Sequence, residues 1–332
     1  NRHQGAGVAG RHRRVSGSVL DLLHGHAHGR IFFTPQCDLD RVVHRHHLGG
    51  VKDGQPRLPG EARVVEQGAE NGLVADQGDR ALVAVLAQER GGGTGANVAR
   101  ALATAGVETG FVGYLGNDQH GTDLAAELAE SPIQHLQLTR IDGPTSHVLI
   151  LVDGTGDRSI LGMAPDHLAV VSLKNVPLQP GDTVVFVVWR AHFAADLAIA
   201  QAAGCKVVVG LDAVQDPNVA GGFLAIGSIH DVTNPAQLQQ LAQRFERVVV
   251  TAGAQGATEY RGGQTLQQPA LPTSVVDATG AGDSFLAGYL TALARGIDDS
   301  ATALRLAATW AAATVGSQAS VPPPFACLGF EL

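Results

Sequence analysis

The residues best suited to chemistry lie between positions 276 and 290, where the chain reads Val-Asp-Ala-Thr-Gly-Ala-Gly-Asp-Ser-Phe-Leu-Ala-Gly-Tyr-Leu. Gly280, Ala281 and Gly282 leave the backbone bare directly before Asp283, and apolar residues with helical spacing follow. A bare turn that opens a helix directs unpaired N–H groups, and the positive end of the helix dipole, at one point. Such a point binds phosphate, and a carboxylate at its rim can take a proton from a neighbouring hydroxyl. The stretch therefore predicts an anion hole at residues 280–282 and a general base, Asp283.

A simpler interpretation is a glycine-rich loop that leads into a core helix, with Asp283 only complementing the helix dipole. The full string favours the first interpretation, because it resembles the second signature of the ribokinase-like carbohydrate kinases (the phosphofructokinase B type), usually Asp-Thr-Thr-Gly-Ala-Gly-Asp. Only the second position differs, where Ala278 stands for Thr. The resemblance implies an ATP-dependent phosphotransferase that acts on a sugar hydroxyl.

A second cluster, Gly91-Gly92-Gly93-Thr94-Gly95-Ala96-Asn97-Val98-Ala99, joins glycines that let a ligand approach the main chain to an asparagine. The amide of Asn97 can donate and accept hydrogen bonds, as a partner of a sugar hydroxyl must. The cluster resembles the first family signature, Gly-Gly-x-x-x-Asn-x-Ala. The resemblance implies that Gly92, Gly93 and Asn97 bind the substrate.

The same glycines, with Ala96, also fit a loose dinucleotide-binding fingerprint. That fingerprint needs an acidic residue at the end of the next strand, about 20 residues on. Glu108 precedes the expected strand and Asp118 follows it after a glycine turn, so the fit is poor. An NAD(P)-dependent oxidoreductase remains the less favoured alternative.

A buried strand expected at 247–251 ends in Thr251 and is followed by Gly253 and Gly256. In open α/β sheets, ligands bind beyond the carboxyl ends of the strands. The pattern resembles the family's Thr-x-Gly-x-x-Gly, which implies that these three residues line the nucleotide site. No Gly-x-x-x-x-Gly-Lys-[Ser/Thr] loop occurs in the sequence, so a Walker-type NTPase is excluded.

Metal binding is inferred from the resemblance. The family often has Asn-x-x-Glu before the nucleotide strand, where Glu helps to organise Mg²⁺ through water; here Asn234-Pro235-Ala236-Gln237 ends in a neutral amide. Asn234 is therefore a candidate for cofactor binding, with Mg²⁺ held mainly by ATP phosphates. Residues 316–322 resemble the ribokinase ending Gly-Ala-Gln-Pro-Ser-Val-Pro, which implies a monovalent cation, K⁺, near Asp277 and Ser320.

From about residue 90 onward, strands alternate with helices of about ten residues, the pattern of βαβ units around a parallel sheet. We expect helices at 96–105, 121–130, 194–203, 236–245, 283–295 and 301–315, and strands at 109–115, 145–153, 158–163, 184–189, 206–211 and 247–251. The fold class predicted with the resemblance is α/β: a three-layer ribokinase-like fold, with a mostly parallel sheet, helices on both faces and a small β lid. Residues 86–325 would form this kinase domain, and the hairpin at about 145–163 would form part of the lid.

Composition narrows the function further. The chain has 332 residues, 45% of them apolar, and a net charge of −8, which argues against nucleic acid as the main partner. Three cysteines, Cys37, Cys205 and Cys327, are widely spaced and suggest a reducing compartment. No run of apolar residues reaches membrane-spanning length. We expect a cytoplasmic enzyme that binds ATP and a small sugar, without membrane contact, and a homodimer is one possible assembly.

Residues 1–85 depart from this rhythm. Residues 1–50 hold seven of the arginines and eight of the fourteen histidines, without periodicity. We interpret residues 1–85 as an anomalous segment: disordered, added by cloning, or translated in the wrong frame. The family begins with a strand carrying an Asp that grips the sugar, followed by lid strands, and no such pattern is evident here. A kinase-fold protein that binds ligands with impaired catalysis is therefore a second alternative.

Overall fold

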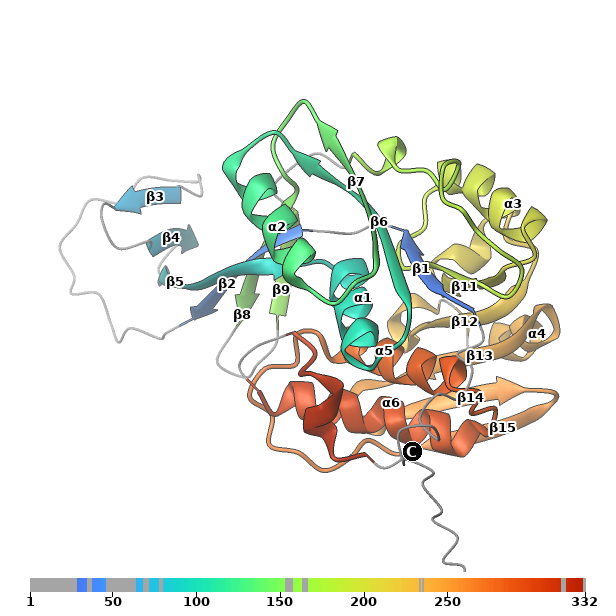
Figure 1. The fold of residues 1–332 in the computed structure, drawn as a ribbon. Helices are drawn as coiled ribbons and strands as arrows, with labels where there is room; N and C mark the ends of the chain where they lie inside the picture. The colour runs from blue at the N-terminus through green and yellow to red at the C-terminus, as the bar shows by residue number, and fades with distance from the viewer. Residues whose placement is uncertain are drawn as a thin grey trace, which may run out of the picture.

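The computed structural model describes residues 29–34, 38–45, 64–67, 72–77, 80–152, 158–162, 167–232, 234, 236–317 and 321–330. The described chain forms a large sheet with helices on both faces, and a smaller sheet lies beside it (Figure 1). The helices are α1 (Thr94–Thr104), α2 (Gln119–Glu130), α3 (Ala194–Ala202), α4 (Gln237–Arg244), α5 (Ala281–Ala294) and α6 (Ser300–Val315). Within the described residues, no helix is both long and apolar enough to cross a membrane.

The large sheet has the strand order β15-β14-β13-β12-β11-β10-β1-β6-β7. Its strands are β1 (Ile31–Thr34), β6 (Thr109–Gly116), β7 (His135–Ile141), β10 (Thr183–Phe186), β11 (Lys206–Gly210), β12 (Gly222–Ser228), β13 (Phe245–Thr251), β14 (Ala257–Arg261) and β15 (Gln264–Gln268). All neighbours from β13 to β7 pair in parallel, whereas β14 and β15 add an antiparallel edge. The predicted mostly parallel sheet is confirmed.

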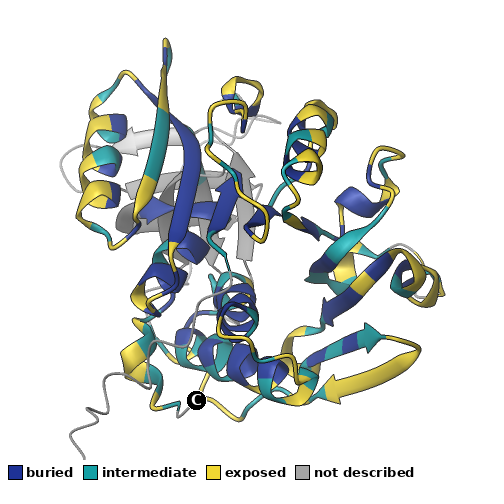
Figure 2. Ribbon diagram, turned by 45° about the vertical axis from the view of Figure 1, so that its right-hand side comes forward, coloured by how far each residue is buried: buried dark blue, intermediate teal, exposed yellow. Residues whose placement is uncertain are grey.

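The core divides into two apolar layers because successive side chains of a strand point to opposite faces. In β10, Val185 packs in the layer under α1, α2, α5 and α6, whereas Val184 and Phe186 pack in the layer under α3 and α4. Buried residues accordingly gather in the central strands and on the helix faces turned toward them (Figure 2). Because both faces of the sheet are covered, the central strands consist of nearly continuous runs of apolar residues.

Helix α5 is buried almost all round, from Ser284 to Thr291, because it lies between the sheet and α6. A close approach of α5 to α6 is possible at Gly288, where an added Cβ would lie 2.7 Å from the Cα of Ala307. Helix α5 is therefore held tightly, and its N-terminus is fixed relative to the strands of the large sheet.

The smaller sheet has the order β3-β4-β5-β2-β8-β9. Its strands are β2 (Asp38–Arg45), β3 (Val64–Gln67), β4 (Gly72–Gln77), β5 (Arg80–Gly92), β8 (His147–Val152) and β9 (Arg158–Gly162). Strands β8 and β9 pair antiparallel, which confirms the predicted hairpin. In Figure 1 this sheet lies on the left, beside α1 and α2.

The structure corrects our expectation that residues 1–85 lack a first strand and lid strands. Strand β1 is paired on both sides, with β10 and β6, in the middle of the large sheet. Strands β2, β3 and β4, with the first part of β5 up to residue 85, supply over half of the smaller sheet. The sequence hid these strands because β1 has only four residues, and because the strands of the smaller sheet follow segments rich in Arg, His and Gly. Residues 1–28 lie outside the described part of the chain.

Candidate active site

A cavity of about 360 Å³ opens at the carboxyl ends of β10, β11, β12 and β13, where ligands of parallel α/β sheets bind. The N-terminus of α5 closes one side of it through Gly282, Asp283, Phe285 and Leu286. The remaining lining residues are Thr94, Val185, Phe186, Val187, Val208, Val209, Gly210, Asp212, Ile226, Gly227, Ser228, Asp231 and Thr251. The cavity thus joins residues from the first, second and third sequence motifs.

The start of α5 has the geometry of an anion site. Gly280 precedes the helix with a φ of 77°, a left-handed conformation that a residue with a Cβ adopts only at a cost, and it makes no side-chain cap. Among the described residues, the amides of Gly280 and Gly282 have no hydrogen-bond acceptor. The amide of Ala281 donates to the carbonyl of Ala278 over a long 3.3 Å. The turn therefore leaves two of the three predicted donors available for a ligand.

Asp283 lies half-buried on the first turn of α5, at the cavity wall. Its Oδ2 accepts a hydrogen bond of 2.8 Å from Nδ2 of Asn97. Asn97 is 4% exposed and sits on the first turn of α1, which begins after Gly93 with a φ of 87°. Two motifs 186 residues apart in the sequence therefore meet at the predicted base.

The residues predicted to bind the nucleotide do not all line the cavity. Thr251 ends β13, lines the cavity, and donates its hydroxyl to the carbonyl of Gly227 at 3.2 Å. Gly253 and Gly256 shape the turn between β13 and β14, with φ values of 53° and 92°, and are not lining residues. Asn234 is exposed outside the cavity lining, and its Oδ1 accepts from the amide of Ala236 at 3.0 Å.

The residues expected to hold a monovalent cation are only partly described. Asp277 is buried, and its Oδ1 accepts from the amide of Thr279 at 2.8 Å. The amides of Val276 and Asp277 both donate to the carbonyl of Val315, at 2.9 and 3.2 Å. These bonds fasten the segment before the glycine turn onto the end of α6. Ser320 lies outside the described residues.

Sequence reasoning missed two carboxylates of the cavity. Asp212 follows β11 and accepts from the amide of Trp189 at 3.3 Å, whereas Asp231 follows β12 and accepts from the amide of Ser228 at 2.8 Å. Partial burial, together with the nearby charge of Asp231, raises the pKa of Asp212. The spacing Ser228-x-x-Asp231 parallels Asn-x-x-Glu, and this signal could have found Asp231. It was overlooked because β12, with glycines at both ends of its core, was not predicted.

A third acidic residue of interest belongs to the smaller sheet. Asp38 begins β2 and pairs in register with Gly92 of β5, one of the glycines assigned to the substrate. Leu39 pairs with Gly91 in the same ladder. The structure corrects the expectation that this segment has no strand-borne Asp, because Asp38 begins β2 beside the second motif.

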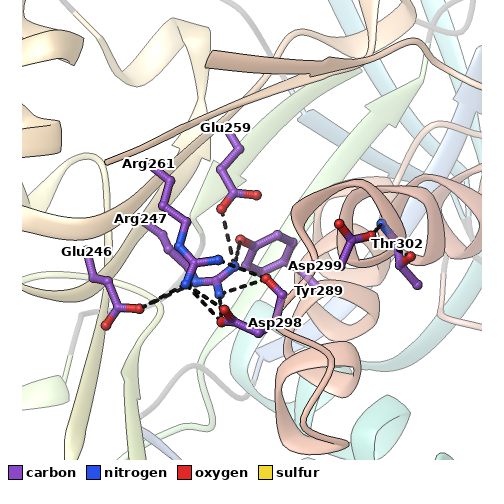
Figure 3. Close-up of polar contacts among 8 residues, drawn as sticks. All are labelled: Glu246, Arg247, Glu259, Arg261, Tyr289, Asp298, Asp299 and Thr302. Atoms are coloured by element: carbon purple, nitrogen blue, oxygen red, sulfur yellow. Dashed lines mark hydrogen bonds and ion pairs between the residues drawn. The ribbon is translucent and has the colours of Figure 1, made fainter. Parts of the chain in front are cut away.

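A partly buried ionic cluster fixes α5 against β13 and β14 (Figure 3). Arg247 of β13 is fully buried and donates to Glu259 of β14 and to the hydroxyl of Tyr289 of α5, both at 3.2 Å. It also pairs with Asp298, which Arg261 contacts from β14. Burial raises the pKa of the Tyr289 hydroxyl, which therefore stays neutral and can accept from Arg247. The cluster holds together the strand that carries Thr251 and the helix that carries Asp283.

The dinucleotide alternative does not fit this arrangement. Its fingerprint requires a strand and helix of one parallel βαβ unit. The glycines at 91 and 92 instead end β5, a strand of the smaller sheet whose described partners are antiparallel. The turn into α1 thus lies outside the parallel sheet that a dinucleotide site needs.

Comparison with known proteins shows which family the chain belongs to. The family model described as pfkB family carbohydrate kinase matches residues 75–185 and 224–324. A fructokinase of Klebsiella pneumoniae is 28% identical over 253 residues, which cover 64% of this chain and 80% of the fructokinase. A ribokinase of Arabidopsis thaliana is 26% identical over 268 residues, covering 71% of this chain and 69% of the ribokinase.

Solved structures show the same fold. Ribokinase from Thermotoga maritima superimposes with a TM-score of 0.65 at 18% identity, covering 90% of this chain and 97% of the other. Arabidopsis thaliana ribokinase complexed with ribose and ATP gives a TM-score of 0.64 at 22% identity, covering 91% and 99%. The fold is therefore ribokinase-like, and the protein is a phosphotransferase of the carbohydrate kinase class.

The chain belongs to the pfkB family of carbohydrate kinases. Membership means that its substrates are ATP and a sugar, and that its acceptor is a sugar hydroxyl. The family thus confirms the class of reaction that the first motif predicted.

Proposed function

We propose that Asp283 takes the proton from the attacking sugar hydroxyl while the amides at residues 280–282 hold the transferring phosphoryl group of ATP. The observation that carries this proposal is the common wall on which Asp283 and the glycine turn meet Thr251 in one cavity. Donors fixed in advance toward developing charge each contribute about 3–4 kcal/mol to catalysis in well-studied enzymes. A carboxylate within hydrogen-bond reach of the hydroxyl supplies the general base.

The cavity suits Mg²⁺ bound together with phosphates. Asp212 and Asp231 both open into it, and their proximity disfavours a second negative charge unless a cation compensates. Among the described residues, no group of three or more His, Cys, Asp or Glu side chains could hold a metal alone. Two carboxylates suffice for Mg²⁺, which keeps several waters and binds nucleotide phosphates directly. When bound, the ion would neutralise charge on the phosphates of ATP.

The sugar would lie between the second motif and the lid. Gly92 and Gly93 would allow it close to the main chain, and Asn97 would hydrogen-bond a hydroxyl beside Asp283. The backbone pairing of Asp38 with Gly92 would bring the start of β2 next to these residues. We assign no single sugar: the relatives include a fructokinase, a ribokinase and an ATP-dependent ribose-1-phosphate kinase.

The remaining ligand assignments rest on the family resemblance. Gly253 and Gly256 would keep the turn after Thr251 open to the nucleotide. Potassium would bind near Asp277, and replacing K⁺ by Na⁺ in the assay tests this: equal rates would remove the proposal. Asn234 would act on the nucleotide only if the segment around it closed toward the cavity.

A coupled assay of ADP release over a panel of ketoses, aldoses, sugar phosphates and nucleosides tests the function. We expect turnover on at least one hydroxyl compound, dependent on Mg²⁺ and lost in Asp283→Asn. Ligand binding without ADP release from any compound would instead favour a kinase fold that only binds its ligands. Titration with NAD(P)H, followed by fluorescence, should show no binding.

A further inference from the structure

Asn97 has partners on both sides of its side-chain amide. Nδ2 donates to Asp283 at 2.8 Å, and Oδ1 accepts from Nη2 of Arg100 at 3.2 Å. The same Nη2 donates to the main-chain carbonyl of Gly91, also at 3.2 Å. Arg100 follows Asn97 by one helical turn on α1, and its side chain is 14% exposed. The carbonyl it holds belongs to the residue directly before the two glycines assigned to the sugar.

These contacts fix which end of the Asn97 amide faces the base. A guanidinium can only donate hydrogen bonds, whereas an ionised carboxylate can only accept them. The oxygen of Asn97 must therefore face Arg100, and its NH₂ must face Asp283. Without Arg100, the amide could turn over and present its oxygen to the carboxylate, and two acceptors would then face each other in a half-buried site.

We propose that Arg100 is a positioning residue of the kinase: it holds the Asn97 amide with its NH₂ toward Asp283 and anchors the main chain at Gly91. This inference rests on the proposed role of Asp283 as the base. Asp283 thereby keeps one oxygen bound to a fixed donor, so the orientation of its carboxylate is set before substrate arrives. Pre-set geometry of this kind matters because small misplacements of a reacting group cost large factors in rate.

Arg100 also pairs through Nη1 with Glu127 of α2, so a purely structural role as a link between α1 and α2 must be separated from positioning. Glu127 is 46% exposed, and an exposed ion pair contributes little to stability. Glu127→Ala removes that link while leaving the contacts of Arg100 with Asn97 and Gly91. It is the matched control for the structural interpretation.

The test is the steady-state kinetics of Arg100→Met, which keeps the length of the side chain but removes its donors. We expect kcat to fall between about 10- and 100-fold, with the KM for ATP within about twofold of wild type. Arg100→Lys keeps one charged donor and should recover part of the loss. Glu127→Ala should leave kcat within about twofold of wild type. Thermal unfolding of each variant checks that it folds.

The double variant gives the decisive comparison. If Arg100 acts through Asn97, then Arg100→Met should lower kcat much less in an Asn97→Ala background than in wild type, because interacting residues are not additive. Equal losses in both backgrounds, or a Glu127→Ala variant as slow as Arg100→Met, would overturn the inference. Failure of the proposed function looks different, because Asp283→Asn would then remain active.

Discussion

Helices α5 and α6 follow each other in the chain and pack together, yet they begin in opposite ways. Helix α6 starts at Asp299, whose carboxylate accepts from the amide and the hydroxyl of Thr302, at 2.8 and 2.7 Å. The N-cap of helix α5 is Gly280, which has no side chain that could accept a hydrogen bond. The carboxylate at this helix start belongs to Asp283, which lies within the first turn. An N-cap carboxylate consumes the amides it bonds. A glycine start leaves them for a ligand, so the same residue type caps one helix and lines the cavity at the other.

The contrast between the two helix starts is tested most directly by removing the charge of each carboxylate in turn, beginning with Asp283→Asn. We expect kcat to fall by at least about 1,000-fold, since the amide cannot take a proton, while ATP still binds. Kinetics and equilibrium binding of ATP measure the two separately. A variant that retains about a tenth of the wild-type kcat would reject the base assignment.

Substitutions of the two glycines at the start of α5 should have different effects on stability and on activity. Gly280→Ala puts a Cβ on a left-handed residue, which costs about 1–2 kcal/mol and shifts the donors, so both stability and kcat should fall. Gly282→Ala meets no atom within 4 Å and should fold like wild type. Its methyl group would instead occupy space at the cavity wall and raise the KM for ATP by about tenfold. Equal unfolding temperatures for the two variants would contradict the geometry.

Asp212→Asn sharpens the comparison on the opposite wall of the cavity. We expect the Mg²⁺ concentration for half-maximal activity to rise by about tenfold, with little change at Asp216→Asn, a neighbouring carboxylate outside the lining. Because folding raises the pKa of Asp212, the wild-type protein loses stability as the pH rises through that pKa. Without Mg²⁺, the Asn variant should therefore gain in Tm relative to wild type between acidic and neutral pH. An unchanged Mg²⁺ requirement would exclude Asp212 from the metal site.

Asp118 is the N-cap of α2, on the side of the molecule where we propose that the sugar binds. Burial alone would raise its pKa, but bonds from the hydroxyl and amide of Thr145 and from the amide of Gly121 lower the pKa to about 2. Asp118→Asn should cost about 1 kcal/mol at neutral pH. Since a lowered pKa gives stability that is lost as the pH falls, the difference from wild type should shrink below about pH 4 and vanish only below pH 2, where the carboxylate is protonated in the folded protein as well. Acid unfolding curves of both proteins measure this; a difference that persists at about pH 1 would exclude the carboxylate as its source.

The smallest effect is expected at the start of α6. Asp299→Ala removes a cap from an exposed helix end, so the Tm should fall by only a few degrees. Its kcat should equal that of wild type, because the residue lies outside the cavity lining. A loss of activity here would mean that both helix starts serve the reaction, and the contrast between them would fail.

Much of the fold could be predicted from the sequence. The prediction failed mainly for strands whose apolar pattern is short or interrupted. Helices α1 to α6 were all expected within a few residues of their observed bounds, because each carries an apolar stripe or run with turn residues beside it. Strand β12 was missed since Gly222 and Gly227 interrupt its apolar pattern, and β1 since four residues show no period. Both strands are stabilised by pairing with neighbours on each side, which no local window contains.

The amino-acid sequence by itself determined the glycine turn at the start of α5: three small residues before a carboxylate form a helix start whose donors are neighbours in the chain. It also determined the class of enzyme, because four motifs stand in the family's order. Only the tertiary structure decided which side chains meet at that helix start. Asn97 reaches Asp283 because α1 packs against α5, and Asp231 lies in the same cavity because the order of the parallel strands brings their ends to one edge. Contacts across more than a hundred residues depend on that order, which local propensity does not encode.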